Sequence, residues 1–186
     1  MTIPGLKPAY WADDVAHVQN AVGNPLFKQV ELNWSTPTLW TAEMCWPAFE
    51  CDVPFVYALL QANGQLDVQK HIMYVGATAA PDTRFGNAAT ARTIIDKLGA
   101  VQFSYAPIRL DSTVMPSSDI AASVEEIEHL LIWAIGDDLE NQKNMFTLPG
   151  MGANGCGAWH ITNTGYGFTG RMPQEIIYPW MLITPA

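Results

Sequence analysis

The stretch PFVYALLQ at residues 54–61 and the stretch KHIMYVG at residues 70–76 decide the fold of this chain. Both are short apolar runs, and an Asn-Gly pair at residues 63–64 lies between them. Short apolar runs separated by such a turn signal are typical of antiparallel strands joined by a hairpin. We therefore expect the two stretches to pair as neighbouring antiparallel strands.

Two helices and a third strand are expected downstream of this hairpin. A helix is predicted over residues 82–98, because Asp82 can cap its start and Gly99 follows its last apolar position. The apolar run 101–109 is typical of a strand, and a second helix is predicted over residues 118–135. The order strand, strand, helix, strand, helix predicts an α+β fold with a small antiparallel three-stranded central sheet flanked by helices.

The chain is expected to form a single compact domain over residues 1–186, because it shows no repeat and no linker rich in Gly or Ser. Residues 54–144 would form its core, with an N-terminal extension over 1–53 and a Gly-rich C-terminal extension over 145–186. The extensions are expected to hold a short helix over 12–20 and strands over 27–33 and 158–162. The aromatic residues of the C-terminal extension are typical either of a base-stacking surface or of a compact loop: Trp159, Tyr166 and Phe168.

The charge balance restricts the partners. Acidic residues outnumber basic ones by 18 to 9, so the net charge of -9 argues against nonspecific coating of nucleic acid. Only residues 54–110 carry more basic than acidic groups, so a phosphate-facing surface is expected there. No apolar run is long enough for a membrane span, and no basic and apolar leader is present. We expect a soluble, acidic, cytoplasmic protein that makes no contact with a membrane.

The cysteines and one glycine-rich motif predict no cofactor. Cys45, Cys51 and Cys156 are odd in number and lack a CxxC spacing, so they are expected to be reduced and buried. The motif GMGANG at residues 150–155 matches G-x-G-x-x-G, but neither a strand before it nor a helix after it is expected, so a dinucleotide site is excluded. His160 lies near Cys156, yet two possible ligands are no metal set, and a hydrogen-bonded histidine is expected.

Each predicted helix places one charged residue on its apolar face. In the first helix the face consists of Arg84, Ala88, Ala91, Ile95 and Leu98, and in the second of Ala121, Val124, Glu128, Leu131 and Ile135. A buried lone carboxylate is costly unless it is paired or binds a cation, so the two charges indicate either a mutual ion pair or a site. Two simpler readings remain open: Arg84 reaches solvent past the sheet edge, and Glu128 bonds a Tyr or Trp.

These residues together resemble the catalytic domain of the GIY-YIG nuclease superfamily, over about residues 54–144. The resemblance is carried by the following parts: the motifs FVY at 55–57 and YVG at 74–76, Thr78, Arg84 eight residues after Gly76, Phe85, and a later helix with Glu128. In that family an Asn closes the site, which corresponds to Asn141 here, with Asn144 as the alternative. Two positions depart from the family pattern: the first motif has Phe-Val-Tyr in place of Gly-Ile-Tyr, and Ala88 stands where many members have His.

The resemblance implies a metal-dependent endonuclease that hydrolyses DNA or RNA, in restriction, phage conflict or as a toxin. It implies that Glu128 holds Mg²⁺ or Mn²⁺ and that Arg84 binds a nonbridging phosphate oxygen. It also assigns water activation to Tyr57 and positioning of the water or phosphate to Tyr74, with Asn141 closing the site. The basic residues of a nuclease should gather around one concavity: Arg84, Arg92, Lys97 and Arg109. The alternative is an inactive binding module on the same scaffold that docks a protein partner through its acidic surface.

Overall fold

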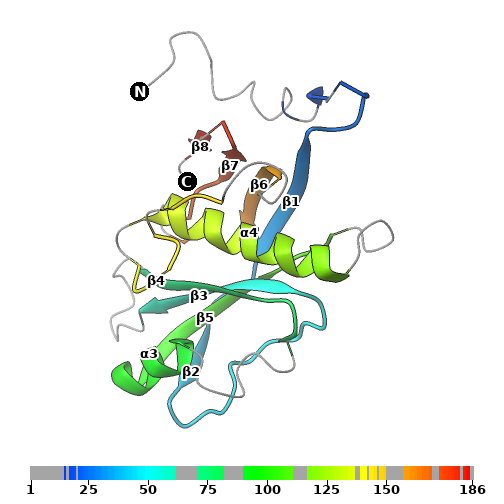
Figure 1. Cartoon of the computed structure of the whole chain (residues 1–186). Coiled ribbons are helices and arrows are strands. Elements are labelled where there is room, and N and C mark those ends of the chain that lie inside the picture. The colour runs from blue at the N-terminus through cyan, green and yellow to red at the C-terminus, as the bar shows by residue number, and fades with distance from the viewer. Residues whose placement is uncertain are drawn as a thin grey trace.

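The computed structural model describes residues 15, 17–19, 21–61, 71–81, 90–110, 117–136, 139–141, 143–145, 147–149, 157–168, 172–180 and 182–184. Its elements are β1 (Phe27–Trp34), β2 (Thr38–Thr41), β3 (Phe55–Gln61), β4 (Ile72–Thr78), α3 (Thr90–Leu98), β5 (Ala100–Pro107), α4 (Ser117–Ile135), β6 (Ala158–Gly165), β7 (Glu175–Tyr178) and β8 (Leu182–Thr184). The strands form two sheets, and α4 lies between them (Figure 1). The predicted α+β class is confirmed.

The first sheet, here called the core sheet, has the strand order β2-β5-β3-β4, and all of its pairs are antiparallel. Tyr57 in the central strand β3 lies opposite Gly76 on β4 and opposite Tyr105 on β5. The predicted hairpin and third strand are therefore present, and β2 from the N-terminal extension adds a fourth strand. The helix predicted over 82–98 is observed from Thr90 to Leu98, and its first part lies outside the described residues.

A glycine ends each of the two helices, as was expected for Gly99. Gly99 and Gly136 have φ angles of 79° and 83°, a left-handed conformation that glycine adopts without a steric penalty. The N–H of Gly99 donates to the carbonyl of Ile95 at 2.7 Å, and that of Gly136 donates to the carbonyl of Ile132 at 3.0 Å. These bonds satisfy carbonyl groups that a helix end would otherwise leave without a partner.

The second sheet, with the strand order β1-β6-β7-β8, joins the two extensions of the chain. β1 runs parallel to β6, in a register from Phe27 opposite Ala158 to Trp34 opposite Gly165. The strands predicted over 27–33 and 158–162 are confirmed, whereas their pairing, β7 and β8 were not expected. One strand of the N-terminal extension and three strands of the C-terminal extension thus form one sheet. Most of the helix expected over 12–20 lies outside the described residues.

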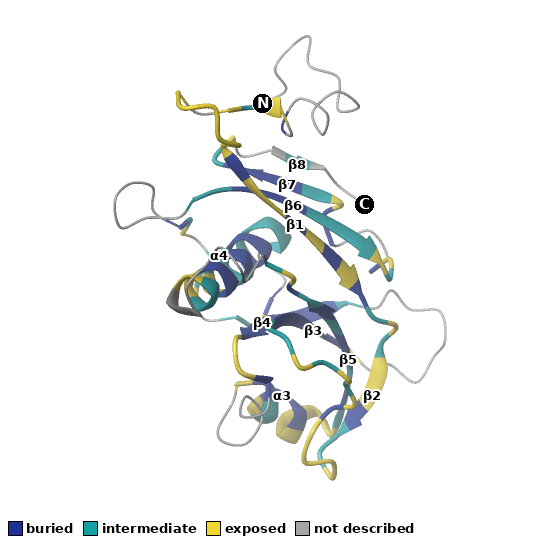
Figure 2. Cartoon of the chain, turned by 90° about the vertical axis from the view of Figure 1, so that its right-hand side faces the viewer, coloured by how far each residue is buried: buried dark blue, intermediate teal, exposed yellow. Residues whose placement is uncertain are grey.

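Helix α4 is the middle layer of the molecule (Figure 2). Its buried residues share one hydrophobic core with both sheets: Ile127 and Leu131 from α4, Val56 and Val75 from the core sheet, and Trp159 from the second sheet. A helix that is apolar on opposite sides is expected where both sides are covered. Full burial of one such aliphatic side chain contributes roughly 1.5–3 kcal/mol.

The other face of the core sheet carries a second, aromatic core that packs against α3. It includes Trp40, Phe55, Tyr57 and Phe103, together with Ile95 of the helix. Because α3 and α4 cover opposite faces, the first six residues of β3 are all buried. The core sheet is therefore shielded on both faces around the residues of the two tyrosine motifs.

Candidate functional site

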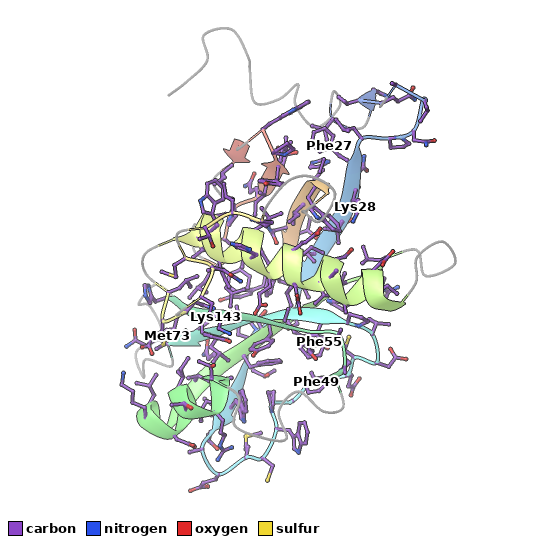
Figure 3. The ribbon with its side chains drawn as sticks, viewed as in Figure 1. Phe27, Lys28, Phe49, Phe55, Met73 and Lys143 are labelled. Atoms are coloured by element: carbon purple, nitrogen blue, oxygen red, sulfur yellow. The ribbon has the colours of Figure 1, made fainter. Side chains whose placement is uncertain are left out.

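The two motif tyrosines lie side by side in the aromatic core that faces α3. The ring of Tyr57 is fully buried, 6.1 Å from the ring of Tyr74 and 5.7 Å from that of Phe103, measured between centroids. Tyr74 is 6% exposed. Phe49 covers the same core from the loop before β3, with its ring 5.2 Å from that of Phe55 (Figure 3). The structure thus brings Tyr57 and Tyr74 together and excludes solvent from Tyr57.

Gly76 is required by the position of Tyr57. The two residues are direct cross-strand partners, and a Cβ atom at position 76 would overlap the Cζ and hydroxyl oxygen atoms of the Tyr57 ring. An aromatic ring that covers a cross-strand glycine is a known way to fix the register of a strand pair. The glycine of the second motif therefore has a packing role that depends on the tyrosine of the first.

Asn141 binds the free edge of β4. Its side-chain Oδ1 accepts from the N–H of Val75 at 3.0 Å, and its Nδ2 donates to the carbonyl of Val75 at 2.8 Å. The neighbouring N–H of Glu140 donates to the carbonyl of Met73 at 2.6 Å. The Asn141 amide thereby pairs with backbone groups between Tyr74 and Gly76 that an edge strand leaves open. The alternative, Asn144, has a left-handed backbone with φ of 66°.

Glu128 lies in α4 at the end of β4. It is half-buried, and Val124 and Leu131 on the same helix face are buried, so the prediction that Glu128 faces inward is confirmed. Its carboxylate lines a pocket of about 440 Å³ together with Thr78 and Glu125. No Lys or Arg is found among the described residues that line this pocket.

The core sheet separates the tyrosines from this pocket. Val56 and Val75 point toward α4 and share its core, whereas Tyr57 and Tyr74 belong to the core of α3. Side chains alternate between the faces of a strand, so Tyr57 and its neighbour Val56 cannot face the same helix. The tyrosines and Glu128 are thus on opposite faces. Arg84, Phe85 and Ala88 lie outside the described residues.

The described basic residues do not gather at the Glu128 pocket. The guanidinium of Arg92 donates to the carbonyls of Ala42 and Met44 and pairs with Asp96, with the Nε and Oδ1 atoms 3.0 Å apart. Arg92 therefore holds the loop after β2. Arg109 lines another pocket, next to Glu31 on β1.

Two further polar contacts were not predicted as pairs. Trp159 Nε1 donates to a Glu126 carboxylate oxygen at 2.6 Å, which connects α4 to the second sheet. His160 Nε2 and Glu175 Oε1 are 2.6 Å apart, so the expectation of a hydrogen-bonded histidine is confirmed. The only hint of the Trp159–Glu126 hydrogen bond in the sequence is that Glu126 is a polar residue on a helix whose two sides are both covered.

Burial tests the expectations for the aromatic residues of the C-terminal extension and for the cysteines. Trp159 and Phe168 are fully buried and belong to the core of α4, so these two rings offer no base-stacking surface, and Trp159 lies in strand β6 instead of a loop. The expectation of buried cysteines is wrong for Cys45, which is exposed, and for Cys51, which is half-buried. Both lie in the segment between β2 and β3, which runs over the surface. Cys156 lies outside the described residues.

Comparison with family models, with curated proteins and with solved structures finds no match to this chain. Within the described part of the chain, no group of three or more His, Cys, Asp or Glu residues is placed to hold a metal ion. The described helices include none that is long and apolar enough to cross a membrane. The interpretation of the site therefore depends on its own geometry.

Proposed function

We propose that this chain is a metal-dependent phosphodiester hydrolase of the GIY-YIG type, acting on DNA or RNA. The observation that carries the proposal is the arrangement around β4. Tyr57 covers Gly76 across the central strand pair, Asn141 binds the strand edge beside them, and Glu128 lines a pocket at the strand end. Tyr57 and Gly76 belong to the two motifs, Glu128 lies in helix α4, and Asn141 follows that helix in the chain.

The lining of the pocket fits a hard divalent cation. Glu125 and Glu128 offer carboxylate oxygens, and Thr78 offers a hydroxyl. Mg²⁺ and Mn²⁺ prefer oxygen ligands, and Mg²⁺ keeps several waters, so one or two carboxylates are sufficient. When bound, such a cation would neutralise charge on the phosphate and lower the pKa of its water.

The residues of the chain have separate tasks in this proposal. Glu128 binds the cation, and Arg84 binds a nonbridging phosphate oxygen. Asn141 fixes the edge of β4, which carries Thr78 at its end. The resemblance assigns water activation to Tyr57, but its ring is fully buried on the face of the core sheet opposite Glu128, so this task would require the aromatic core to open.

A second candidate function is favoured by the burial of Tyr57. The ring is fully buried and lies on the face of the core sheet opposite Glu128. A chain that keeps this fold but does not hydrolyse phosphodiesters would be a binding module. Its net charge of -9 would suit a basic protein partner.

The deciding experiment measures nicking of supercoiled plasmid, single-stranded DNA and RNA by the purified chain, with Mg²⁺, Mn²⁺ or EDTA. We expect metal-dependent cleavage that Glu128→Gln lowers by about a hundredfold or more, comparable with the loss of other charge-stabilising groups. Glu43→Gln is the matched control, because Glu43 is an exposed residue outside the pocket.

Tyr57→Phe separates the two candidates further. It removes the hydroxyl and keeps the ring in the aromatic core, so a fall in rate without a fall in stability supports the catalytic role. A folded wild type that cleaves none of the three substrates, or a Glu128→Gln variant that cleaves as fast as wild type, overturns the hydrolase and leaves the binding module.

A further inference from the structure

The face of the second sheet that points away from α4 is divided into an apolar and a polar part. At one end Phe27 of β1 and Ile177 of β7 pack with Val15 of the N-terminal segment. Beyond them the outward side chains of β1, β6 and β7 are all polar: Gln29, Glu31, Asn33, His160, Thr162, Thr164 and Glu175. The three strands lie side by side in the sheet (Figure 2).

A histidine and a glutamate form a fixed pair on the polar part. The His160 and Glu175 side chains are only 11% and 13% exposed, and the Nε2 to Oε1 distance is 2.6 Å. Within the described part of the chain this is the one hydrogen bond of the His160 ring. Because a carboxylate only accepts, it holds the proton on Nε2 and leaves Nδ1 of the neutral ring as an acceptor. His160 can therefore accept a hydrogen bond from a ligand.

The strand register places further polar groups around this pair. Thr162 lies opposite Glu31 on one side and opposite Glu175 on the other, and Gln29 lies opposite His160. The Thr164 hydroxyl donates to Glu31 Oε1 at 2.9 Å. Each of the two carboxylates is thus already engaged by a neighbouring side chain, which orients it.

These side chains line a pocket of about 450 Å³, within the roughly 300–1,000 Å³ of small-molecule sites. Its described lining is Gln29, Val30, Glu31, His160, Thr162 and Thr164. This lining has no Lys or Arg to neutralise a phosphate or a carboxylate ligand. The carboxylates of Glu31 and Glu175 already accept hydrogen bonds from Thr164 and His160, so neither needs a bound cation to be satisfied.

We propose that this pocket binds a neutral ligand rich in hydroxyl groups, of the size of a sugar. A hydroxyl group both donates and accepts, so it can satisfy the amide of Gln29, the hydroxyl of Thr162 and the Nδ1 acceptor of His160. The methyl group of Thr162 suits a C–H face of such a ligand. The site lies on the second sheet and does not rest on the proposed hydrolase.

The test titrates the full chain with D-glucose, D-galactose, N-acetylglucosamine and cellobiose, and with methylammonium and inorganic phosphate as charged probes. Binding is followed by the NMR signals of the His160 ring. We expect at least one sugar to shift these signals with a Kd on the order of a millimolar, as for ligands of this size.

Two variants and one control locate the site. Thr162→Val keeps the side-chain shape and removes the hydroxyl, and Gln29→Ala removes the amide; each should weaken sugar binding about tenfold. Gln61→Ala is the matched control, because Gln61 is an exposed glutamine at the end of a strand in the core sheet, and binding should not change. Thermal melting confirms that each variant is folded.

The proposal is overturned if none of the four sugars shifts the His160 signals. It is also overturned if methylammonium or phosphate binds more tightly than every sugar, or if both variants bind like wild type. Failure of plasmid cleavage has no bearing on this result, because the readout is binding at another sheet.

Discussion

Replacement of Gly76 by Ala tests whether Tyr57 and Gly76 form one packing unit. The added methyl would overlap the Tyr57 ring, and neither residue can withdraw easily, because β3 is paired on both sides and its first six residues are buried. Overpacking in a closed core typically costs 1–3 kcal/mol, so we expect a loss of about 2 kcal/mol in the free energy of unfolding. For a chain of this length that corresponds to a fall of roughly 4–8 °C in Tm.

The assay is urea denaturation of four proteins in a double-mutant cycle: wild type, Gly76→Ala, Tyr57→Leu and the double variant. Leucine removes the overlapping ring atoms, so Gly76→Ala should cost little in that background, with a coupling of about 1–2 kcal/mol. Gly167→Ala is the control, since a Cβ there meets nothing within 4 Å and the change should stay within about 0.5 kcal/mol. The reasoning is refuted if Gly76→Ala is as stable as wild type, or if it costs the same with Leu as with Tyr at position 57.

Three further variants test the layers around α4 by urea denaturation. Asn141→Ala leaves the N–H and carbonyl of Val75 without their partner and should cost about 1–3 kcal/mol; a loss under 0.5 kcal/mol would mean that Asn141 does not hold the edge of β4. Trp159→Phe removes the hydrogen bond to Glu126 and should cost about 1.5–3 kcal/mol, and the loss should shrink when Glu126→Gln is present. Leu131→Ala opens a cavity in the core shared by both sheets and should cost about 2–5 kcal/mol; a loss under 1 kcal/mol would contradict the sandwiched position of the helix.

The central part of the fold could be predicted from the sequence because its signals are local. The hairpin of β3 and β4 follows from two apolar runs and a turn, and Gly99 and Gly136 mark the helix ends within the chain itself. The second sheet gave no such signal. Its first pair joins β1 to β6, from Phe27 opposite Ala158 to Trp34 opposite Gly165, and a parallel pair between distant segments needs no turn that a sequence could display.

The candidate site could be predicted only residue by residue. The periodicity of α4 was sufficient to place Glu128 on an inward face, and the half-burial of its side chain agrees. Helix α4 covers the face of the core sheet that carries Val56 and Val75, and the second sheet packs on the other side of the helix. The sequence therefore gave no way to foresee that Tyr57 and Tyr74 would face α3 while Glu128 lines a pocket on the opposite side.

The most direct test of the proposed function is the affinity of the chain for Mn²⁺, measured by electron paramagnetic resonance of the free ion. Loss of a group that only orients a metal ligand typically costs 10–100-fold in affinity, so the loss of a ligand itself should cost at least about tenfold. We predict that Glu128→Gln weakens Mn²⁺ binding by at least that factor, while Glu43→Gln binds Mn²⁺ like wild type. Equal affinity in wild type and Glu128→Gln, or no Mn²⁺ binding by the folded wild type, would contradict it.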